Sequence, residues 1–116
     1  MKILIIVNDA PYGSERMYNA LRLASALAKR DGIEIKIFLI GDAASGAHKG
    51  QKVPQGCYNV QTMLTAVIHR KASVGVCGTC MDARGMTDAD LVEGSHRSSM
   101  EELTNWTIDA DKVITF

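Results

Sequence analysis

Apolar residues form two kinds of pattern along the chain, one typical of buried strands and one typical of amphipathic helices. Continuous apolar runs predict strands that are covered on both faces, at residues 3–7, 33–40, 73–77 and 112–116. Between them, apolar residues at helical spacing predict a helix that Ser14 caps and that ends at Asp31 and Gly32. A second helix is predicted over 60–68 by the same spacing.

The remaining elements are short and are predicted mainly from capping residues. They are, in chain order, a helix over 80–84 capped by Thr79 with Asp82, a helical turn at Thr87 with Asp90, a strand within 91–97, and a last helix through Trp106 capped by Ser98 with Glu101. The segment 42–56, rich in Gly and Ala, is predicted to be a loop, either irregular throughout or with a short helical turn, that is long enough to act as a lid. Strands separated by helices indicate an α/β fold, a three-layer α/β/α sandwich with a mainly parallel five-stranded sheet.

This topology predicts where a functional site would lie. In open parallel sheets, ligands bind in the crevice beyond the carboxyl ends of the strands. Three loops follow the predicted strands at that edge, at residues 8–13, 41–56 and 77–84. We therefore expect these loops to meet at one edge of the sheet.

Size and charge limit the possible partners. The 116 residues, 47% of them hydrophobic, predict a single domain over residues 1–116. Lys and Arg number 13, and Asp and Glu also number 13, so no net positive charge attracts nucleic acid or an anionic membrane. The apolar start is too short for a signal sequence or membrane helix, and three cysteines indicate a reducing compartment, so we expect a cytoplasmic protein.

The segment with the most reactive candidate side chains contains two thiols, Cys77 and Cys80. Cys77 ends a predicted strand and Cys80 begins a predicted short helix, so both sulfurs should lie near unpaired backbone N–H groups. Such donors lower a thiol pKa from its free value of about 8.5 and raise the thiolate fraction that persulfide transfer or disulfide exchange needs. Arg84, four residues after Cys80, is assigned a supporting role in holding an anionic ligand.

Cysteine and histidine also have structural interpretations. Free cysteine is often a buried packing residue, and this interpretation is favoured for Cys57. A C-x-x-C pair is shared by redox enzymes and zinc sites, but zinc would need about four ligands, and no further pair stands at ligand spacing. His48, His69 and His96 are interpreted as surface residues, none of them a convincing general base. We expect no metal and no cofactor.

Other residues at the same edge are candidates for ligand binding. Tyr12, Gly13 and Ser14 precede the first helix, whose N–H groups could bind an anion, although plain capping by Ser14 is the simpler interpretation. Asp42 could receive a ligand hydroxyl or simply form a turn. Thr79 lies between the two thiols and completes the set.

Several stretches together resemble a known family. They are Pro11 to Arg16, Gly41-Asp42, Cys77 eight residues before Gly85 in an Ala-Arg-Gly ending, Leu91 to Gly94, and the closing Asp111 to Phe116. With these stretches the chain resembles the DsrE/DsrF-like family, which includes sulfur-relay subunits related to TusD and YchN-like proteins. The resemblance covers essentially the whole chain.

The resemblance implies a fold, an assembly and a chemistry. It implies a five-stranded parallel sheet, a homotrimer or homohexamer, and a cysteine at the position of Cys77 that carries sulfane sulfur as a persulfide. The implied partners are sulfur donor and acceptor proteins or small sulfur compounds. Cys80 is not required by the sulfur-relay members, which leaves open a resolving role.

Three functions remain open from the sequence. The first is a sulfurtransferase-like carrier that uses Cys77. The second is a non-enzymatic small-anion-binding or assembly module in which the cysteines only pack. The third is a dithiol redox switch formed by Cys77 and Cys80.

Overall fold

Five parallel strands form the middle layer of the computed structural model, which describes residues 1–116. They are β1 (Lys2–Val7), β2 (Glu34–Leu39), β3 (Ser73–Cys77), β4 (Ser95–Ser98) and β5 (Lys112–Thr115), in the spatial order β4-β3-β2-β1-β5. Every neighbouring pair is parallel, which confirms the predicted sheet. Because β1, β2 and β3 are adjacent, the segments that follow them emerge side by side at one edge.

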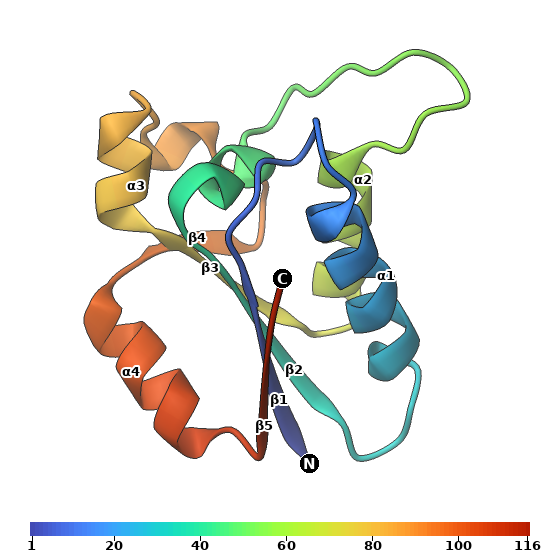
Figure 1. The fold of residues 1–116 in the computed structure, drawn as a ribbon, viewed down its shortest axis with the longest axis vertical. Helices are drawn as coiled ribbons and strands as arrows, with labels where there is room; N and C mark the ends of the chain where they lie inside the picture. The colour runs from blue at the N-terminus through green and yellow to red at the C-terminus, as the bar shows by residue number, and fades with distance from the viewer.

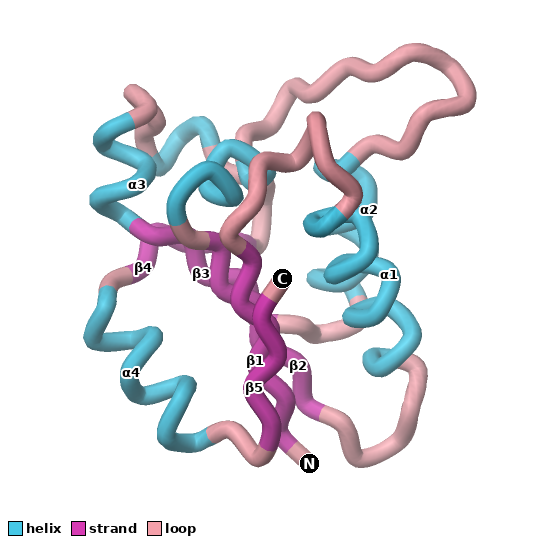
Figure 2. The backbone as a smooth tube through the Cα atoms, in the orientation of Figure 1, coloured by secondary structure: helices cyan, strands magenta, loops and turns pink.

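Helices cover both faces of this sheet. α1 (Arg16–Ala28) and α2 (Val60–His69) pack side by side on one face, and α4 (Met100–Asp109) lies on the other (Figures 1 and 2). The predicted three-layer α/β/α sandwich is confirmed. No helix is long and apolar enough to cross a membrane.

The two faces bury cores of different size. The face under α1 and α2 carries a cluster of 22 buried residues, whereas the face under α4 carries four, namely Leu4, Phe38, Leu103 and Trp106. Within the smaller core, the rings of Phe38 and Trp106 meet edge to face with centroids 6.2 Å apart. A single helix therefore anchors that side of the sheet through few large side chains.

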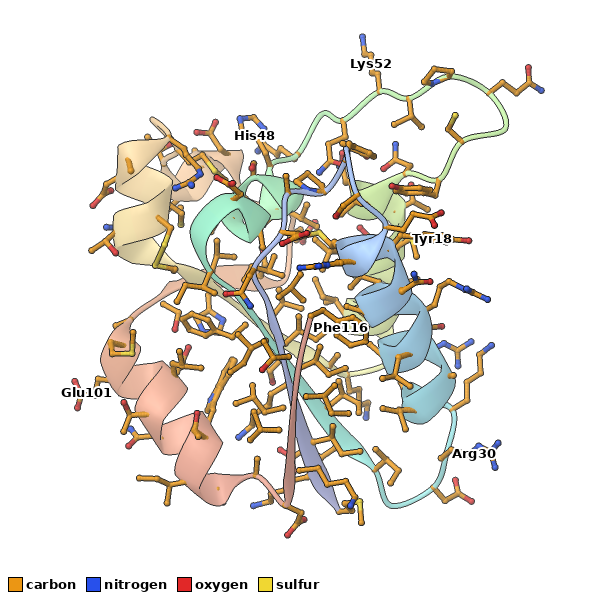
Figure 3. The ribbon with its side chains drawn as sticks, in the orientation of Figure 1. Tyr18, Arg30, His48, Lys52, Glu101 and Phe116 are labelled. Atoms are coloured by element: carbon orange, nitrogen blue, oxygen red, sulfur yellow. A yellow bond between two sulfur atoms is a disulfide. The ribbon has the colours of Figure 1, made fainter.

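Shorter elements occupy the carboxyl edge of the sheet. They are η1 (Gly41–Ala47), α3 (Gly78–Ala83) and η2 (Asp88–Asp90). The short helical turn considered within 42–56 is present as η1, but a lid is wrong for this half of the segment, because Ala43, Ala44 and Ala47 are buried in the larger core. Only the segment after η1 projects from the body, with Lys52 near its tip (Figure 3).

Two predicted caps lie one residue away from the observed ones. Ser14 is not the N-cap of α1, which begins at Arg16 after Glu15; its hydroxyl oxygen accepts the Arg16 N–H at 3.4 Å while the hydroxyl donates to Asp9 Oδ2 at 3.0 Å. α4 is capped by Ser99 and not by Ser98, since the Ser99 hydroxyl accepts the Glu102 N–H at 3.3 Å. Each error places a cap one residue too early, because a run of polar residues offers several possible oxygens.

The short elements around the thiols also differ in detail. α3 begins at Gly78, and its N-cap is Cys77 rather than Thr79. The strand predicted within 91–97 begins only at Ser95, because Ser95 N–H closes a turn onto Val92 O at 3.0 Å. The helical turn predicted at Thr87 with Asp90 is confirmed as η2.

Removing the ring of Phe38 tests the smaller core. Phe38 is 1% exposed, so Phe38→Ala should lower the free energy of unfolding by about 3–5 kcal/mol, the cost of truncating a buried Phe. Urea denaturation followed by circular dichroism measures this change. Ile108→Ala on α4 is the control, because Ile108 is 80% exposed and its loss should change stability by less than about 0.5 kcal/mol. Equal losses in both variants would contradict the assigned core.

Candidate functional site

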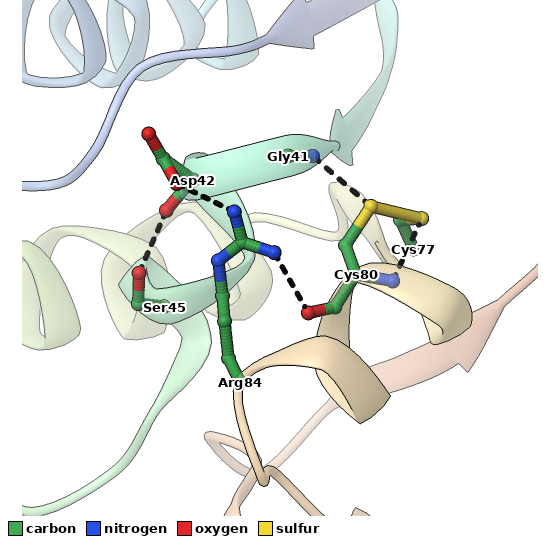
Figure 4. A network of polar contacts seen from close by, with 6 residues as sticks. All are labelled: Gly41, Asp42, Ser45, Cys77, Cys80 and Arg84. Atoms are coloured by element: carbon green, nitrogen blue, oxygen red, sulfur yellow. Dashed lines mark hydrogen bonds and ion pairs between the residues drawn. A yellow bond between two sulfur atoms is a disulfide. The ribbon is translucent and has the colours of Figure 1, made fainter.

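The predicted meeting of loops at the carboxyl edge is present in the structure. η1 follows β2 and contacts α3, which follows β3 directly. This contact brings Cys80 of α3 against Gly41, the first residue of η1, with Cys77 beside it (Figure 4). The site is therefore built by two adjacent parallel strands and the short helix that follows each of them.

Cys77 occupies the N-cap position of α3. Its Sγ accepts the Cys80 N–H at 3.3 Å, an interaction that a serine or threonine oxygen more often makes at this position. The Thr79 hydroxyl lies 3.4 Å from the same sulfur. Thr79 thus contacts the thiol directly, in place of the capping role predicted for it. Hydrogen-bond donors around a sulfur stabilise its thiolate form.

Cys80 lies one turn further and faces η1. Its Sγ accepts the Gly41 N–H at 3.1 Å (Figure 4). The sulfurs of Cys77 and Cys80 lie within disulfide-bonding distance, and their Cα atoms are 5.2 Å apart. The arrangement can therefore perform thiol–disulfide chemistry without a movement of the backbone.

The two sulfurs contact different cores. Cys80 packs against the larger core under α1 and α2, whereas Cys77 packs against the smaller core under α4. Both side chains are partly exposed. The pair therefore lies across the sheet edge, with Cys77 on the side of α4.

Arg84 and Asp42, both predicted as ligand-binding residues, contact each other. Arg84 Nη2 donates to Asp42 Oδ1 at 2.5 Å, and Arg84 Nη1 donates to Cys80 O at 3.0 Å (Figure 4). Arg84 thus folds back over α3, as its supporting role requires, but its charge is already paired with a carboxylate. This bridge ties α3 to η1 beside the thiols.

The other predicted ligand-binding residues lie apart from the thiols. Tyr12 hydroxyl donates to Gln51 Oε1 at 2.6 Å and accepts the Val60 N–H at 3.1 Å. Gly13, with φ of +101°, turns the chain toward Ser14. No hydrogen bond connects these residues with Cys77 or Cys80. The Tyr12 hydroxyl therefore connects the projecting segment, at Gln51, with the first residue of α2.

The prediction that Cys57 is a buried packing residue is wrong. This cysteine was expected to pack as a buried residue at the start of a helix, but it is exposed in the segment before α2. An apolar hollow beside it is lined by Tyr12, Tyr58 and Pro54. The helical spacing begins at Val60, after Cys57, so this thiol lies outside the packed face.

A hollow of about 340 Å³ opens beside Cys77 on the α4 side of the sheet. Its walls come from α3, from the end of β2 and from the turn between β4 and α4, with the lining residues Phe38, Ile40, Cys77, Gly78, Thr79, Arg97, Ser98, Ser99 and Met100. The largest hollow, of about 620 Å³, lies elsewhere, between α2 and the segment before β4. Cys77 lies in the wall of the smaller of these two hollows, whereas no thiol lines the larger one.

Two charged contacts hold the turn between β4 and α4. Arg97 donates to both oxygens of Asp82 on α3, at 2.9 and 2.8 Å, and these hydrogen bonds hold the pKa of the Asp82 carboxyl below its usual value. The Ser98 hydroxyl donates to Glu102 Oε1 at 2.6 Å, and His96 Nε2 pairs with the same oxygen. Burial alone would raise the pKa of Glu102, but the hydrogen bonds from Ser98 and His96 outweigh it and lower that pKa.

Sequence reasoning did not single out Arg97 or Glu102, it named Ser98 only as a helix cap, and it interpreted His96 as a surface residue. The strand register pairs Cys77 with Ser98, so residues that flank the thiol come from a strand whose paired residue is 21 positions away in the chain. The available signal was the short polar strand itself, whose Ser, His and Arg residues were unusual for a parallel sheet. No three His, Cys, Asp or Glu side chains converge in a way that could hold a metal ion.

The model of the DsrE/DsrF-like family matches residues 1–116. The chain belongs to the DsrE/DsrF-like family. It is 42% identical to the protein YchN of Escherichia coli K12, over 99% of this chain and 98% of that protein. An uncharacterised protein of Methanopyrus kandleri is 41% identical over 98% of this chain and 93% of its own length. The resemblance stated from the sequence is confirmed.

Solved structures agree with this assignment. The crystal structure of E. coli YchN, also 42% identical, matches with a TM-score of 0.94 over 99% of this chain and 98% of that one. A protein of unknown function from Methanobacterium thermoautotrophicum, MTH1491, shares the fold at a TM-score of 0.76 with 11% identity, over 99% of this chain and 98% of its own. These names state no activity, so the function of this DsrE/DsrF-like chain has to be argued from its site.

The acid side of the stability profile tests the contacts of Glu102. The pKa of Glu102 is lower in the folded protein than its unfolded value of about 4.3. The ionised carboxylate of Glu102 therefore stabilises the fold at pH values above that unfolded pKa. This stabilisation is lost as the pH falls through the folded pKa. Glu102→Gln should therefore lower the free energy of unfolding more at pH 7 than at pH 3, measured by urea denaturation.

Glu101→Gln is the matched control on the same helix, because Glu101 is exposed and has no ion pair. Its effect should differ less between the two pH values. If Glu102→Gln matched the wild-type stability at pH 7, the contacts of Ser98 and His96 with Glu102 would not stabilise the turn between β4 and α4.

Proposed function

We propose that this protein is a sulfurtransferase-like carrier that holds sulfane sulfur as a persulfide on Cys77. The observation that carries the proposal is the environment of this sulfur, at the carboxyl end of β3 with a backbone N–H and the Thr79 hydroxyl directed at it and with a hollow beside it. The same residue matches the carrier position implied by the family. Sulfur donors and acceptors, whether proteins or small sulfur compounds, are part of this proposal.

The proposed chemistry is a transfer of one sulfur atom in two exchanges. The Cys77 thiolate attacks the terminal sulfur of a donor persulfide, a new S–S bond forms, and the donor leaves as a thiolate that takes the proton lost by Cys77. An acceptor thiolate then attacks the terminal sulfur, and Cys77 leaves as a thiolate. No net oxidation occurs in either exchange, so no electron acceptor is needed.

Mass spectrometry tests the loading of Cys77. The exposed Cys57 is first replaced by Ser, which removes a thiol that could react without any specific site. In this background, a sulfane-sulfur donor should add about one sulfur to the intact protein. The addition should be lost in Cys77→Ser and retained in Cys80→Ser. Loading of Cys77→Ser to the level of its parent would refute the carrier function.

A second function is favoured by the short distance between the two thiols. With Cys77 and Cys80 at disulfide-bonding distance, the Cys80 thiolate could attack Cys77 Sγ in the persulfide. The terminal sulfur would leave as hydrosulfide, and the resulting disulfide would need a thiol reductant to return to the dithiol. The same pair could act as a redox switch without any sulfur cargo.

Replacing Cys80 distinguishes these two uses of the pair. If Cys80 resolves the persulfide, the loaded wild-type protein should release sulfide and lose its extra sulfur, whereas loaded Cys80→Ser should keep that sulfur several-fold longer. Intact mass and sulfide release are followed over time in the absence of an acceptor. Equal lifetimes in the two proteins would exclude a resolving role for Cys80.

The anion-binding alternative has weaker support. Arg84 is already paired with Asp42, and Ser14 with Asp9, so the polar groups assigned to an anion hold one another. The proposed homotrimer or homohexamer is supported by the edge strand β5, where Val113 is 43% exposed. A free dithiol persists best in a reducing compartment, so the proposal retains the cytoplasm as its location.

A further inference from the structure

The hollow beside Cys77 has mostly apolar walls although it lies at a polar edge of the sheet. Phe38 and Ile40, at the end of β2, form one wall, and Met100 at the start of α4 forms another. Met100 is 64% exposed, so its side chain is accessible to a molecule in the hollow. The Cys77 sulfur therefore borders a space that suits an apolar group.

The wall formed by residues 97–100 is held in place from both sides. On one side, the bidentate ion pair of Arg97 with Asp82 fixes this wall to α3. On the other, Ser98 and Ser99 are hydrogen-bonded to Glu102 of α4. A wall with this many fixed contacts gives a largely preformed hollow, as is usual for small-molecule sites.

Gly78 closes the hollow tightly at its base. A Cβ at this position would lie 2.9 Å from Arg97 Nε and 2.9 Å from Ser98 O, so only glycine allows the turn to approach α3 this closely. The hollow is thus bounded by a close backbone contact.

The two thiols have different access to this space. Cys77 lines the hollow, whereas Cys80 packs against the larger core on the other side of the sheet and its sulfur faces Gly41 N–H. A molecule in the hollow can therefore reach Cys77 directly.

We propose that this hollow binds the organic part of a low-molecular-weight persulfide, R–S–SH, in which R is a short aliphatic group. The inference rests on the proposed carrier function and names the class of its donor. The hollow of about 340 Å³ is large enough to hold such a persulfide. Inorganic disulfide carries no apolar group, so it would leave the apolar walls of the hollow without a contact. The hydroxyls of Thr79 and Ser99 at the rim can solvate the sulfur end.

The reaction in this site follows from the position of Cys77. The Cys77 thiolate attacks the terminal sulfur of R–S–SH, the bond between the two donor sulfurs breaks, and the new Cys77 persulfide keeps that terminal sulfur. The product R–S⁻ takes the proton that Cys77 lost and leaves the hollow as the thiol R–SH. The same walls would bind R–SH as an acceptor in the reverse exchange.

The test is a series of alkyl persulfides of increasing chain length, with inorganic disulfide as the donor that lacks R. Loading of the Cys57→Ser protein is followed by intact mass, and each rate is divided by the rate of the same donor with a free small thiol. The relative rate should rise by up to about fourfold for each methylene buried, until the hollow is filled. The inorganic donor should load slowest.

Met100→Gln is the diagnostic variant, because it keeps the length of the side chain while replacing its apolar end, at the first residue of α4. It should flatten the dependence on chain length, so that each added methylene raises the relative rate by much less than the factor of about four expected of the wild-type hollow. Ile108→Gln on the same helix is the control and should retain the full dependence, since Ile108 does not line the hollow. Circular dichroism checks that both variants are folded.

Each outcome decides one proposal. A wild-type rate that does not depend on chain length, with Cys77 still loaded, would overturn the donor site and leave the carrier function standing. A dependence that persists in Met100→Gln would place R elsewhere and also overturn this site. Failure of every donor to load Cys77 would overturn the carrier function, and the inference with it.

Discussion

The close approach between the start of α3 and the end of β4 is the constraint on which the thiol site depends. At Gly78 the chain leaves β3 and turns into α3 while Arg97 and Ser98 pass within 2.9 Å of the missing Cβ. Any side chain here would have to displace the backbone carbonyl of Ser98 as well as the Arg97 guanidinium. Because the turn is tight, Cys77 becomes the N-cap and its sulfur receives the Cys80 N–H.

A second glycine makes room on the same strand. A Cβ at Gly75 would lie 3.1 Å from the Trp106 ring and 3.3 Å from Glu102 Oε1, so α4 can lie closely over β3 only because this position lacks a side chain. The approach brings Glu102 to Ser98 and His96 and fixes the turn that forms one wall of the hollow. Gly75 and Gly78 are thus two close contacts of β3 with the β4–α4 unit, one in the middle of the strand and one just past its end.

Much of this structure could be predicted because its signals are local. The apolar runs of the central strands need burial on both faces wherever the sheet forms, and Cys77 and Cys80 are placed by a strand that ends and a helix that begins within four residues. The wall of the hollow could not be predicted in this way. It depends on the register of Cys77 with Ser98, and four polar residues in an edge strand give no hydrophobic pattern to fix that register.

Each wrong prediction has its own physical cause. Ser14 and Ser98 each stand in a run of polar residues, where neighbouring oxygens can make the same cap and tertiary contacts decide between them. Cys57 was assigned to a helix face that begins three residues later, so its exposure could be seen only once α2 was placed. The alanines of η1 were expected in a lid because small residues occur in loops, yet their small size is what lets η1 pack into the core.

The location of the two thiols determines from which side each sulfur of a Cys77 persulfide would be attacked. A sulfur bound to Cys77 has the hollow and α4 on one side and Cys80 on the other, and S–S exchange is fastest when attacking, central and leaving sulfurs are in line. An attack from the hollow therefore reaches the terminal sulfur and frees Cys77, whereas an attack from Cys80 reaches Cys77 Sγ and expels the terminal sulfur. If Cys77 carries sulfane sulfur as proposed, the molecule in the hollow determines whether that sulfur is passed on intact or lost as hydrosulfide.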